Sequence, residues 1–198
     1  MKGTLLILLF FVAGCTLSVF GFIPTVLVEN DFSTYALYIL MFLVGIGIGI
    51  DKRAIKMLKG ANLGLFLVPL SVGIGSIIGA ALINLAIGQG FKEGMAVGAG
   101  FGYYSLSSIY ITELHGEALG VVALLSNIMR ELLTLLITPL LVKFTGNLSP
   151  IASAGATSMD TTLPVISQYS GKDYVVVALF NGILLTIAVP LLIPFILN

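Results

Sequence analysis

The chain has 198 residues, of which 58% are hydrophobic and only 9% are charged, and its mean hydropathy is +1.13. A soluble globular chain carries about 25% charged residues, so this composition excludes a domain covered by a solvated surface. The formal net charge is zero, which argues against nucleic acid as a partner because no basic patch is available to neutralise phosphates. The sequence therefore predicts an integral membrane protein.

The N-terminus allows two interpretations. "MKGTLLILLFFVAGC" has a basic start, an apolar stretch and a small-residue ending, as does a bacterial lipoprotein signal with Cys15 as the lipidated residue. The apolar run continues through residues 16–28, however, beyond the roughly 20 residues that a spanning helix needs. This continuation favours an uncleaved first transmembrane helix over residues 3–22, with a signal peptide as the alternative. Cys15 is the only cysteine, so no disulfide can form within the chain.

Other apolar stretches indicate further spans. Four are long enough to cross a bilayer, at residues 33–50, 62–87, 118–142 and 174–197. Two more segments are apolar but dense in Gly, Ser and Thr, and we expect them to be broken or re-entrant helices; they are residues 94–111 and 149–168. Long continuous apolar runs exclude a barrel. The prediction is an all-α integral membrane protein with about six or seven transmembrane segments, in which residues 1–198 form a single transporter domain.

Basic residues predict the orientation. The loop at residues 52–59 contains four of them, and such loops lie in the cytoplasm. If both irregular segments cross the membrane, Lys172 lies inside, Lys92 and Lys143 lie outside, and the C-terminus is external.

The span at residues 118–142 carries two charges near its middle, Arg130 and Glu131. On a helix these side chains fall within an arc of about 100° together with Asn127, Thr134 and Thr138. This polar face is predicted to look into the protein or into a water-filled cavity. Adjacent helical residues point about 100° apart, so Arg130 and Glu131 each need a partner elsewhere.

Two roles are open for this face: a salt-bridge network that fixes the packing of the spans, or a substrate or ion site. Charged residues deep in spans usually mark pathways or relays, which favours the site. The other acid predicted to lie deep in the membrane is Asp160. We expect Asp160 to pair with Arg130, which would leave Glu131 free for a mobile cation or a proton.

The two irregular segments contain similar turns. Residues 99–108 and 153–162 are small-residue turns that lead into hydroxyl-rich stretches, spaced about 55 residues apart. Broken helices expose N–H groups that can hold a carboxylate, while their freed carbonyl groups hold cations. Close helix packing through small residues is the alternative. The presence of Asp160, Thr161 and Thr162 in the second turn favours binding.

No enzyme active site or metal site is predicted. Glu113, His115 and Glu117 are spaced two apart, which suits no metal motif, and a solvated loop is the better account. His115 is the only histidine, and no nucleophilic serine is paired with it.

Several motifs together resemble the lysine exporter family of prokaryotic inner membranes, the LysO type: "GFGYYSLSS", "LGVVALLSNIMRELLTLLITPLL" and "GATSMDTTLPVI". "GIGIDKRAIKMLKG" is similar to the cytoplasmic loop of that family. The resemblance runs from about residue 33 to the end of the chain. It implies export of L-lysine or a similar cationic amino acid, by exchange with H+ or Na+ and with no other cofactor.

Lysine carries two ammonium groups and one carboxylate, so its site needs acceptors and donors. Burial disfavours a charged carboxylate, and Glu131 is expected to exchange a proton for the substrate amine, with Asp160 as a second acceptor. The full set of predicted substrate- and ion-binding residues is Asn127, Arg130, Glu131, Asp160, Ser105, Ser107, Thr161 and Thr162.

Members of the family usually carry roughly 100 further residues ahead of the matched region, about the size of a small domain. This difference implies either a split exporter with a separately encoded small N-terminal membrane subunit, or a shorter relative with altered activity. Two other functions are open. One is a non-transporting membrane subunit that packs with a partner, and the other is a carrier for another small metabolite, with Arg130 selecting an anion.

Overall fold

The computed structural model describes residues 63–198 throughout, together with isolated positions nearer the N-terminus: 9, 12–14, 16–17, 19–20, 35, 39, 42 and 46. Most of the expected spans at residues 3–22 and 33–50, and the whole loop at residues 52–59, lie outside the described residues. The chain divides into two units, Met1–Phe42 and Leu43–Asn198. In the first, the described residues from 9 to 19 are helical. The fold of the second unit follows.

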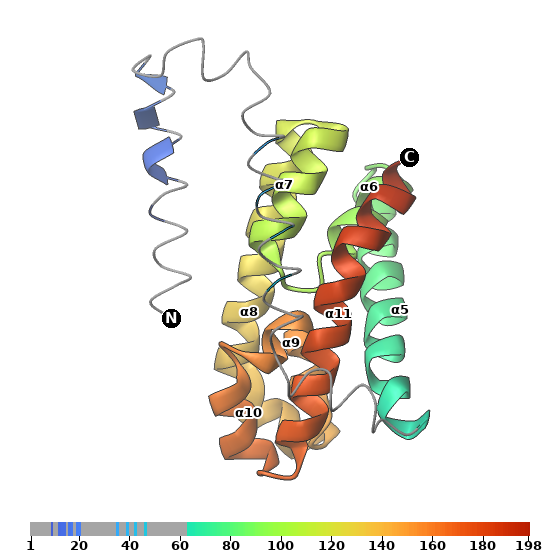
Figure 1. Cartoon of the computed structure of the whole chain (residues 1–198), viewed down its shortest axis with the longest axis vertical. Helices are drawn as coiled ribbons and strands as arrows, with labels where there is room; N and C mark the ends of the chain where they lie inside the picture. Colours follow the sequence, from blue (N-terminus) through green and yellow to red (C-terminus); the bar gives the residue numbers. More distant parts are fainter. Residues whose placement is uncertain are drawn as a thin grey trace. The chain divides into compact units, whose positions relative to one another are not determined.

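Three long helices form the frame of the second unit (Figure 1): α5 (Leu63–Ala86), α8 (Glu117–Thr145) and α11 (Tyr174–Leu197). Each is long and apolar enough to cross a membrane. They coincide with the spans expected at residues 62–87, 118–142 and 174–197. Residues 63–198 contain no strand, which confirms the all-α prediction.

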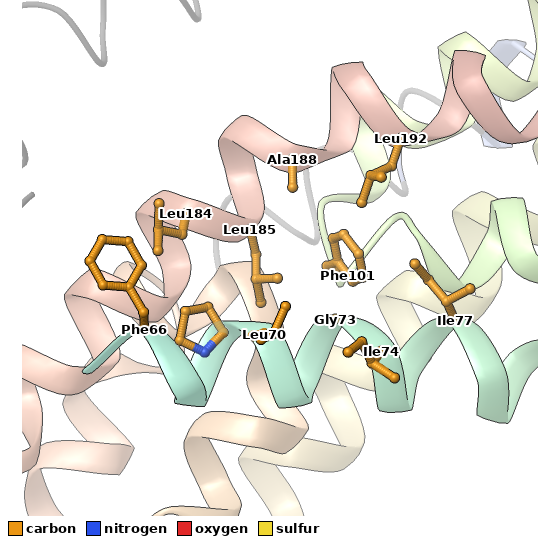
Figure 2. A pocket seen from close by; sticks show the side chains of 11 residues that line it. Phe66, Leu70, Gly73, Ile74, Ile77, Phe101, Leu184, Leu185, Ala188 and Leu192 are labelled. Carbon is orange, nitrogen blue, oxygen red and sulfur yellow. The ribbon is translucent and has the colours of Figure 1, made fainter. Parts of the chain in front are cut away.

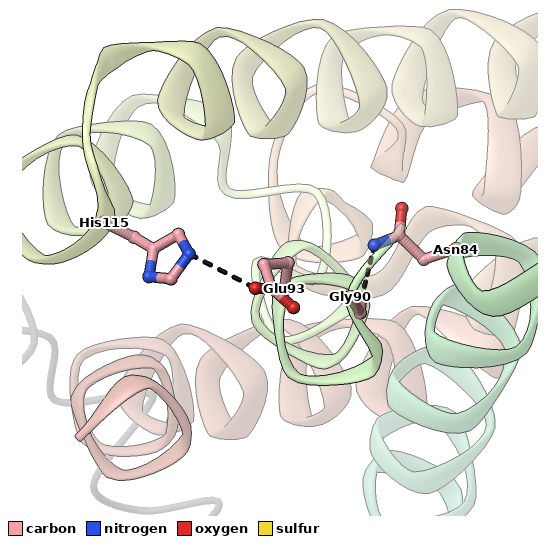
Figure 3. Close-up of polar contacts among 4 residues, drawn as sticks. All are labelled: Asn84, Gly90, Glu93 and His115. Carbon is pink, nitrogen blue, oxygen red and sulfur yellow. Dashed lines mark hydrogen bonds and ion pairs between the residues drawn. The ribbon is translucent and has the colours of Figure 1, made fainter. Parts of the chain in front are cut away.

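The first irregular segment forms a helical hairpin. Helix α6 (Phe91–Gly98) and helix α7 (Tyr104–His115) flank a turn at residues 99–103. The turn reverses the chain because two residues adopt left-handed conformations, Phe101 with φ 51° and Gly102 with φ 92°. His115 Nε2 near the end of α7 lies 3.3 Å from Glu93 Oε1 near the start of α6 (Figure 3). The start of α6 and the end of α7 therefore lie at the same end of the frame.

The second irregular segment is a hairpin of opposite direction. It consists of α9 (Ser149–Ala154), the 3-10 helix η1 (Gly155–Met159) and α10 (Leu163–Ser170). Gly155, with φ 66°, ends α9. Ile151 of α9 and Ile166 of α10 share a buried cluster with Ala178 near the start of α11. In Figure 1, α9 and α10 both lie toward the end of the frame where α8 finishes and α11 begins.

Each segment thus returns to the end of the frame from which it starts, whereas the orientation counted from the sequence took both segments to run from one end to the other. The left-handed residues in the turn of each segment reverse the direction of the chain. A segment that ran on to the other end would need only a break in its helix. Lys143 at the end of α8 and Lys172 just before α11 therefore lie at the same end of the frame. Lys92 and Asn198 lie at the other end.

Small residues allow the first hairpin to pack closely on its neighbours. A Cβ atom on Gly98 of α6 would lie 2.6 Å from the carbonyl oxygen of Ser76 in α5. One on Gly94 would lie 2.8 Å from the Cα atom of Ala81. Such contacts let helix backbones approach without side chains between them, so the packing interpretation of the small residues is correct for α6.

Candidate functional site at the junction of the two hairpins

The tips of the two hairpins touch through their backbones. The amide N–H of Ala156 donates a hydrogen bond to the carbonyl oxygen of Phe101, at 2.8 Å. A Cβ atom on Gly155 would collide with that same oxygen, and one on Gly102 would lie 3.0 Å from the carbonyl oxygen of Ala154. All of these residues are buried. The junction therefore requires glycine both for its left-handed turns and for the close approach.

Asn127, in the middle of α8, holds the tip of the first hairpin. Its Oδ1 accepts a hydrogen bond from the amide of Gly102 at 2.7 Å. Its Nδ2 donates to the carbonyl oxygen of Ala123 at 2.9 Å and, more weakly, to that of Val97 at 3.5 Å. The side chain thus satisfies a buried backbone donor that the turn leaves without a helical partner.

Arg130, one turn further along α8, binds the second hairpin. Its Nε donates to the carbonyl oxygen of Ser153 at 2.8 Å and its Nη2 to that of Ala152 at 3.0 Å, both in the last turn of α9. Its Nη1 donates to the hydroxyl of Ser76 at 2.6 Å, which in turn donates to the carbonyl oxygen of Gly98 at 3.1 Å. Carbonyl groups at a helix C-terminus carry negative partial charge. The guanidinium therefore neutralises the end of α9 directly and the end of α6 through Ser76.

The other three residues of the predicted polar face of α8 also point inward. Glu131 is only 1% exposed, and Thr134 and Thr138 are fully buried. The hydroxyl of Thr134 donates to the carbonyl oxygen of Arg130 at 2.8 Å and lies 2.6 Å from the hydroxyl of Ser153. Glu131 thus places a carboxylate inside the protein, next to the residue that binds the hairpin.

The expected pairing of Arg130 with Asp160 is wrong. Within residues 63–198 no ion pair joins them: Arg130 uses its donors on α9 and Ser76. Asp160 lies in the exposed turn before α10, where its Oδ1 accepts from the amide of Thr161 at 2.5 Å and from its hydroxyl at 3.3 Å. The carbonyl groups at the end of α9 supply the negative charge that the prediction assigned to Asp160.

The predicted hydroxyl residues are divided between different surroundings. Ser107 is fully buried beside Asn127, since a Cβ atom on Gly100 would lie 2.8 Å from the Ser107 hydroxyl and 2.6 Å from Asn127 Nδ2. Thr162 is also buried, but its hydroxyl donates to the carbonyl oxygen of Thr157 at 2.8 Å. Ser105 is half-buried. The structure therefore brings Ser107, Asn127 and Arg130 to the junction, whereas Thr162 stabilises its own turn.

The sequence analysis missed Asn181, which lies fully buried on α11. Its Nδ2 donates to the carbonyl oxygen of Gly155 at 2.9 Å and lies 3.1 Å from the Ser158 hydroxyl. Asn181 follows Asn127 by 54 residues, and Gly155 follows Phe101 by the same number. A hairpin followed by a long helix therefore occurs twice, in opposite directions, as in the inverted repeats of transporters. The sequence contained a sign of this repeat: the two irregular segments are about 55 residues apart, and an asparagine follows each of them at the same distance.

Beside the junction lies an apolar cavity of about 400 Å³ between α5 and α11 (Figure 2). Phe101 forms part of its wall, together with side chains that include Phe66, Ile77, Leu184 and Leu192. All the residues that line it are apolar. The cavity therefore offers no group that could recognise a charge, and the polar chemistry of this region belongs to α8 and the hairpin tips.

Two opposed helical hairpins, meeting inside a frame of helices long enough to span a membrane and beside buried charged residues, are the architecture of a multi-pass membrane transporter. Comparison with known proteins gives the particular family. The family described as "Lysine exporter LysO" matches residues 8–197, and the chain belongs to this family.

Two relatives have curated names. "Lysine exporter LysO" of Escherichia coli (strain K12) is 36% identical over 169 residues, which cover 84% of this chain and 55% of the relative. "Putative lysine exporter" of Haemophilus influenzae (strain ATCC 51907 / DSM 11121 / KW20 / Rd) is 32% identical over 169 residues, 84% of each chain. The chain thus spans about half the length of the Escherichia coli protein. No solved structure gives a significant match.

Proposed function

We propose that this chain exports L-lysine or a similar cationic amino acid across the inner membrane of a prokaryote, by exchange with H+ or Na+. Family membership supports the substrate class. The observation that carries the proposal is the burial of the Glu131 carboxylate, which is 1% exposed and follows directly on Arg130, the residue that binds the second hairpin. Buried carboxylates in spanning helices are expensive and mark substrate or proton pathways.

In this proposal the hairpins act as opposed gates. Each enters from a different end of the frame, and the tips meet through the hydrogen bond from Ala156 to Phe101. Displacing one hairpin from the junction opens a path to one side only, as alternating access requires. Glu131 then holds either a proton or an ammonium group of the substrate. Binding the cationic amine releases the proton, and rebinding the proton releases the amine.

We further propose that the loop at residues 52–59 is cytoplasmic and that Asn198 is external. In this orientation Lys143 is cytoplasmic together with Lys172, because α8 finishes at the end of the frame where α11 begins. Within residues 63–198 this leaves Lys92 as the external basic residue, which agrees better with the positive-inside rule than two crossing segments would.

Flux in proteoliposomes tests the function. Vesicles containing the purified chain would be loaded with labelled lysine, and efflux measured under an imposed H+ or Na+ gradient. Labelled leucine, of similar size but without the second amine, is the control substrate. A second set of vesicles would contain the chain together with the portion of the Escherichia coli relative outside the matched region. Gradient-dependent lysine efflux in either set supports the proposal. Absence of efflux in both contradicts it and favours a packing subunit or a carrier of another metabolite.

A further inference from the structure

Arg130 is surrounded by oxygen atoms of a kind that bind metal cations. Two are backbone carbonyl oxygens at the C-terminal end of α9, those of Ala152 and Ser153, and the third is the hydroxyl oxygen of Ser76. We call these three atoms the oxygen cage. Hard cations are bound by carbonyl and hydroxyl oxygens, and freed carbonyl groups of interrupted helices coordinate Na+ in transporters. In this protein the cage holds a guanidinium.

We propose that Arg130 is a resident cation: its guanidinium fills a cation site at the hairpin junction, which becomes a Na+ site when the side chain is removed. The cage is built from two different elements, α5 and α9. Arg130 reaches it from a third element, α8. The guanidinium thus joins segments that are distant in the sequence, as a bound metal ion does in other proteins.

The electrostatics of the junction explain why a cation is required there. The C-terminal carbonyl groups of α9 meet the guanidinium directly, and the last residue of α6, Gly98, is connected to it through Ser76. The negative ends of two short helices therefore converge in the interior of the protein. An arginine side chain remains protonated in proteins, so it fills the site at every physiological pH without depending on the ion content of either compartment.

This inference also bears on coupling, and in that respect it rests on the proposed function. A site that Arg130 occupies is closed to a mobile Na+. Coupling through the junction is then left to the proton exchanged at Glu131, and lysine efflux from proteoliposomes should respond to a pH gradient but not to a Na+ gradient. The occupancy of the cage itself can be measured without any transport.

Thermal unfolding of the purified full chain in detergent is the direct test. Tm would be compared in NaCl and in choline chloride of equal ionic strength. The wild-type chain should give the same Tm in both salts. Arg130→Ala should unfold at a lower temperature in choline chloride and regain stability in NaCl with saturation, by roughly 5–10 °C at a hundredfold excess over Kd. Millimolar methylguanidinium should stabilise the same variant.

Two control variants separate the cage from a general salt effect. Lys143→Ala removes a positive charge from the exposed end of the same helix, and should show no difference between the salts. The double variant Arg130→Ala with Ser76→Ala lacks one cage oxygen and should lose most of the Na+ response. If Arg130→Ala cannot be purified, Arg130→Gln is the replacement, with the same Na+ response expected.

The proposal is overturned if the arginine variants show no specific stabilisation by Na+ or methylguanidinium. It is equally overturned if wild type responds to Na+ as strongly as the variants do. A chain without lysine flux but with the expected salt responses would contradict the proposed function while leaving the resident cation in place.

Discussion

Asn127 and Asn181 lie 54 residues apart, and each binds the backbone at the tip of a different hairpin. Asn127 accepts a hydrogen bond from the amide of Gly102, whereas Asn181 donates one to the carbonyl oxygen of Gly155. Each hairpin is therefore fixed by the long helix that follows it. The two halves of the repeat therefore place their asparagines alike, but the hydrogen bond runs in opposite directions.

Removing the Asn181 side chain should destabilise the second hairpin. Asn181→Ala removes one of two donors to the buried carbonyl group of Gly155, since the Ser158 hydroxyl also donates to it at 2.7 Å. The loss should cost about 0.5–1.5 kcal/mol, or roughly 2–4 °C in Tm for each kcal/mol. Asn198→Ala, at the exposed end of the same helix, is the control and should leave Tm unchanged. Equal Tm values for the two variants would show that Asn181 does not hold the hairpin.

Gly155 should not tolerate even a methyl group. Gly155→Ala places a Cβ atom against the carbonyl oxygen of Phe101 and requires alanine to adopt a φ of 66°. Strain of this kind costs about 1–3 kcal/mol, and the collision adds to it. Gly75→Ala is a matched control, because open space surrounds that position within α5, and it should be neutral or stabilise by up to about 1 kcal/mol. Thermal unfolding in detergent measures both, and similar stability would contradict the tight junction.

The frame of the fold was predictable from the sequence because it depends on local properties. Continuous apolar runs of sufficient length locate α5, α8 and α11 almost to the residue. The density of Gly, Ser and Thr also located both interruptions correctly. Whether an interrupted segment crosses or returns depends on the φ angles of one or two residues, such as Phe101. Composition does not determine such angles, and a non-glycine residue in that region is uncommon.

The polar face of α8 was predictable from helical periodicity, but the partner of Arg130 was not. Sequence reasoning searches for an opposite charge and therefore selected Asp160. The structure provides backbone carbonyl groups of α9 instead. Every residue carries a backbone carbonyl group. The residue types therefore do not indicate where carbonyl groups take the place of an acidic side chain.

Double-mutant cycles should distinguish these two partners. Arg130→Ala and Asp160→Asn should be additive within about 0.5 kcal/mol, because the side chains do not interact. Arg130→Ala and Ser76→Ala should not be additive, since they share the 2.6 Å hydrogen bond, and coupling of 0.5–3 kcal/mol is typical of such pairs. Unfolding in denaturant gives the four free energies of each cycle. Strong coupling to Asp160 would restore the original pairing.

Labelling of single cysteines should establish the re-entrant path. After replacement of Cys15, an impermeant thiol reagent added to intact cells should label a cysteine at Lys92 or Asn198. It should fail to label one at Lys143 or Lys56 until the membrane is permeabilised. Lys143 is decisive, because crossing segments would place it outside. Labelling there from outside, with Lys56 protected, would contradict the hairpin topology.

The last prediction concerns Glu131. Glu131→Gln keeps the size of the side chain and much of its hydrogen bonding while removing the charge. The variant should fold and insert, because the amide fills the same space and can still accept and donate hydrogen bonds. Net lysine export should nevertheless fall to the level of liposomes without protein, since neither the amine nor the proton has a carboxylate to bind. Glu131→Asp should retain partial export with a shifted pH profile.

Glu117→Gln makes the same change at the exposed start of α8 and should export normally. A structural role predicts the reverse order, with Glu131→Gln poorly expressed and any surviving protein active. Normal export by a well-expressed Glu131→Gln protein would therefore remove this residue from the coupling site.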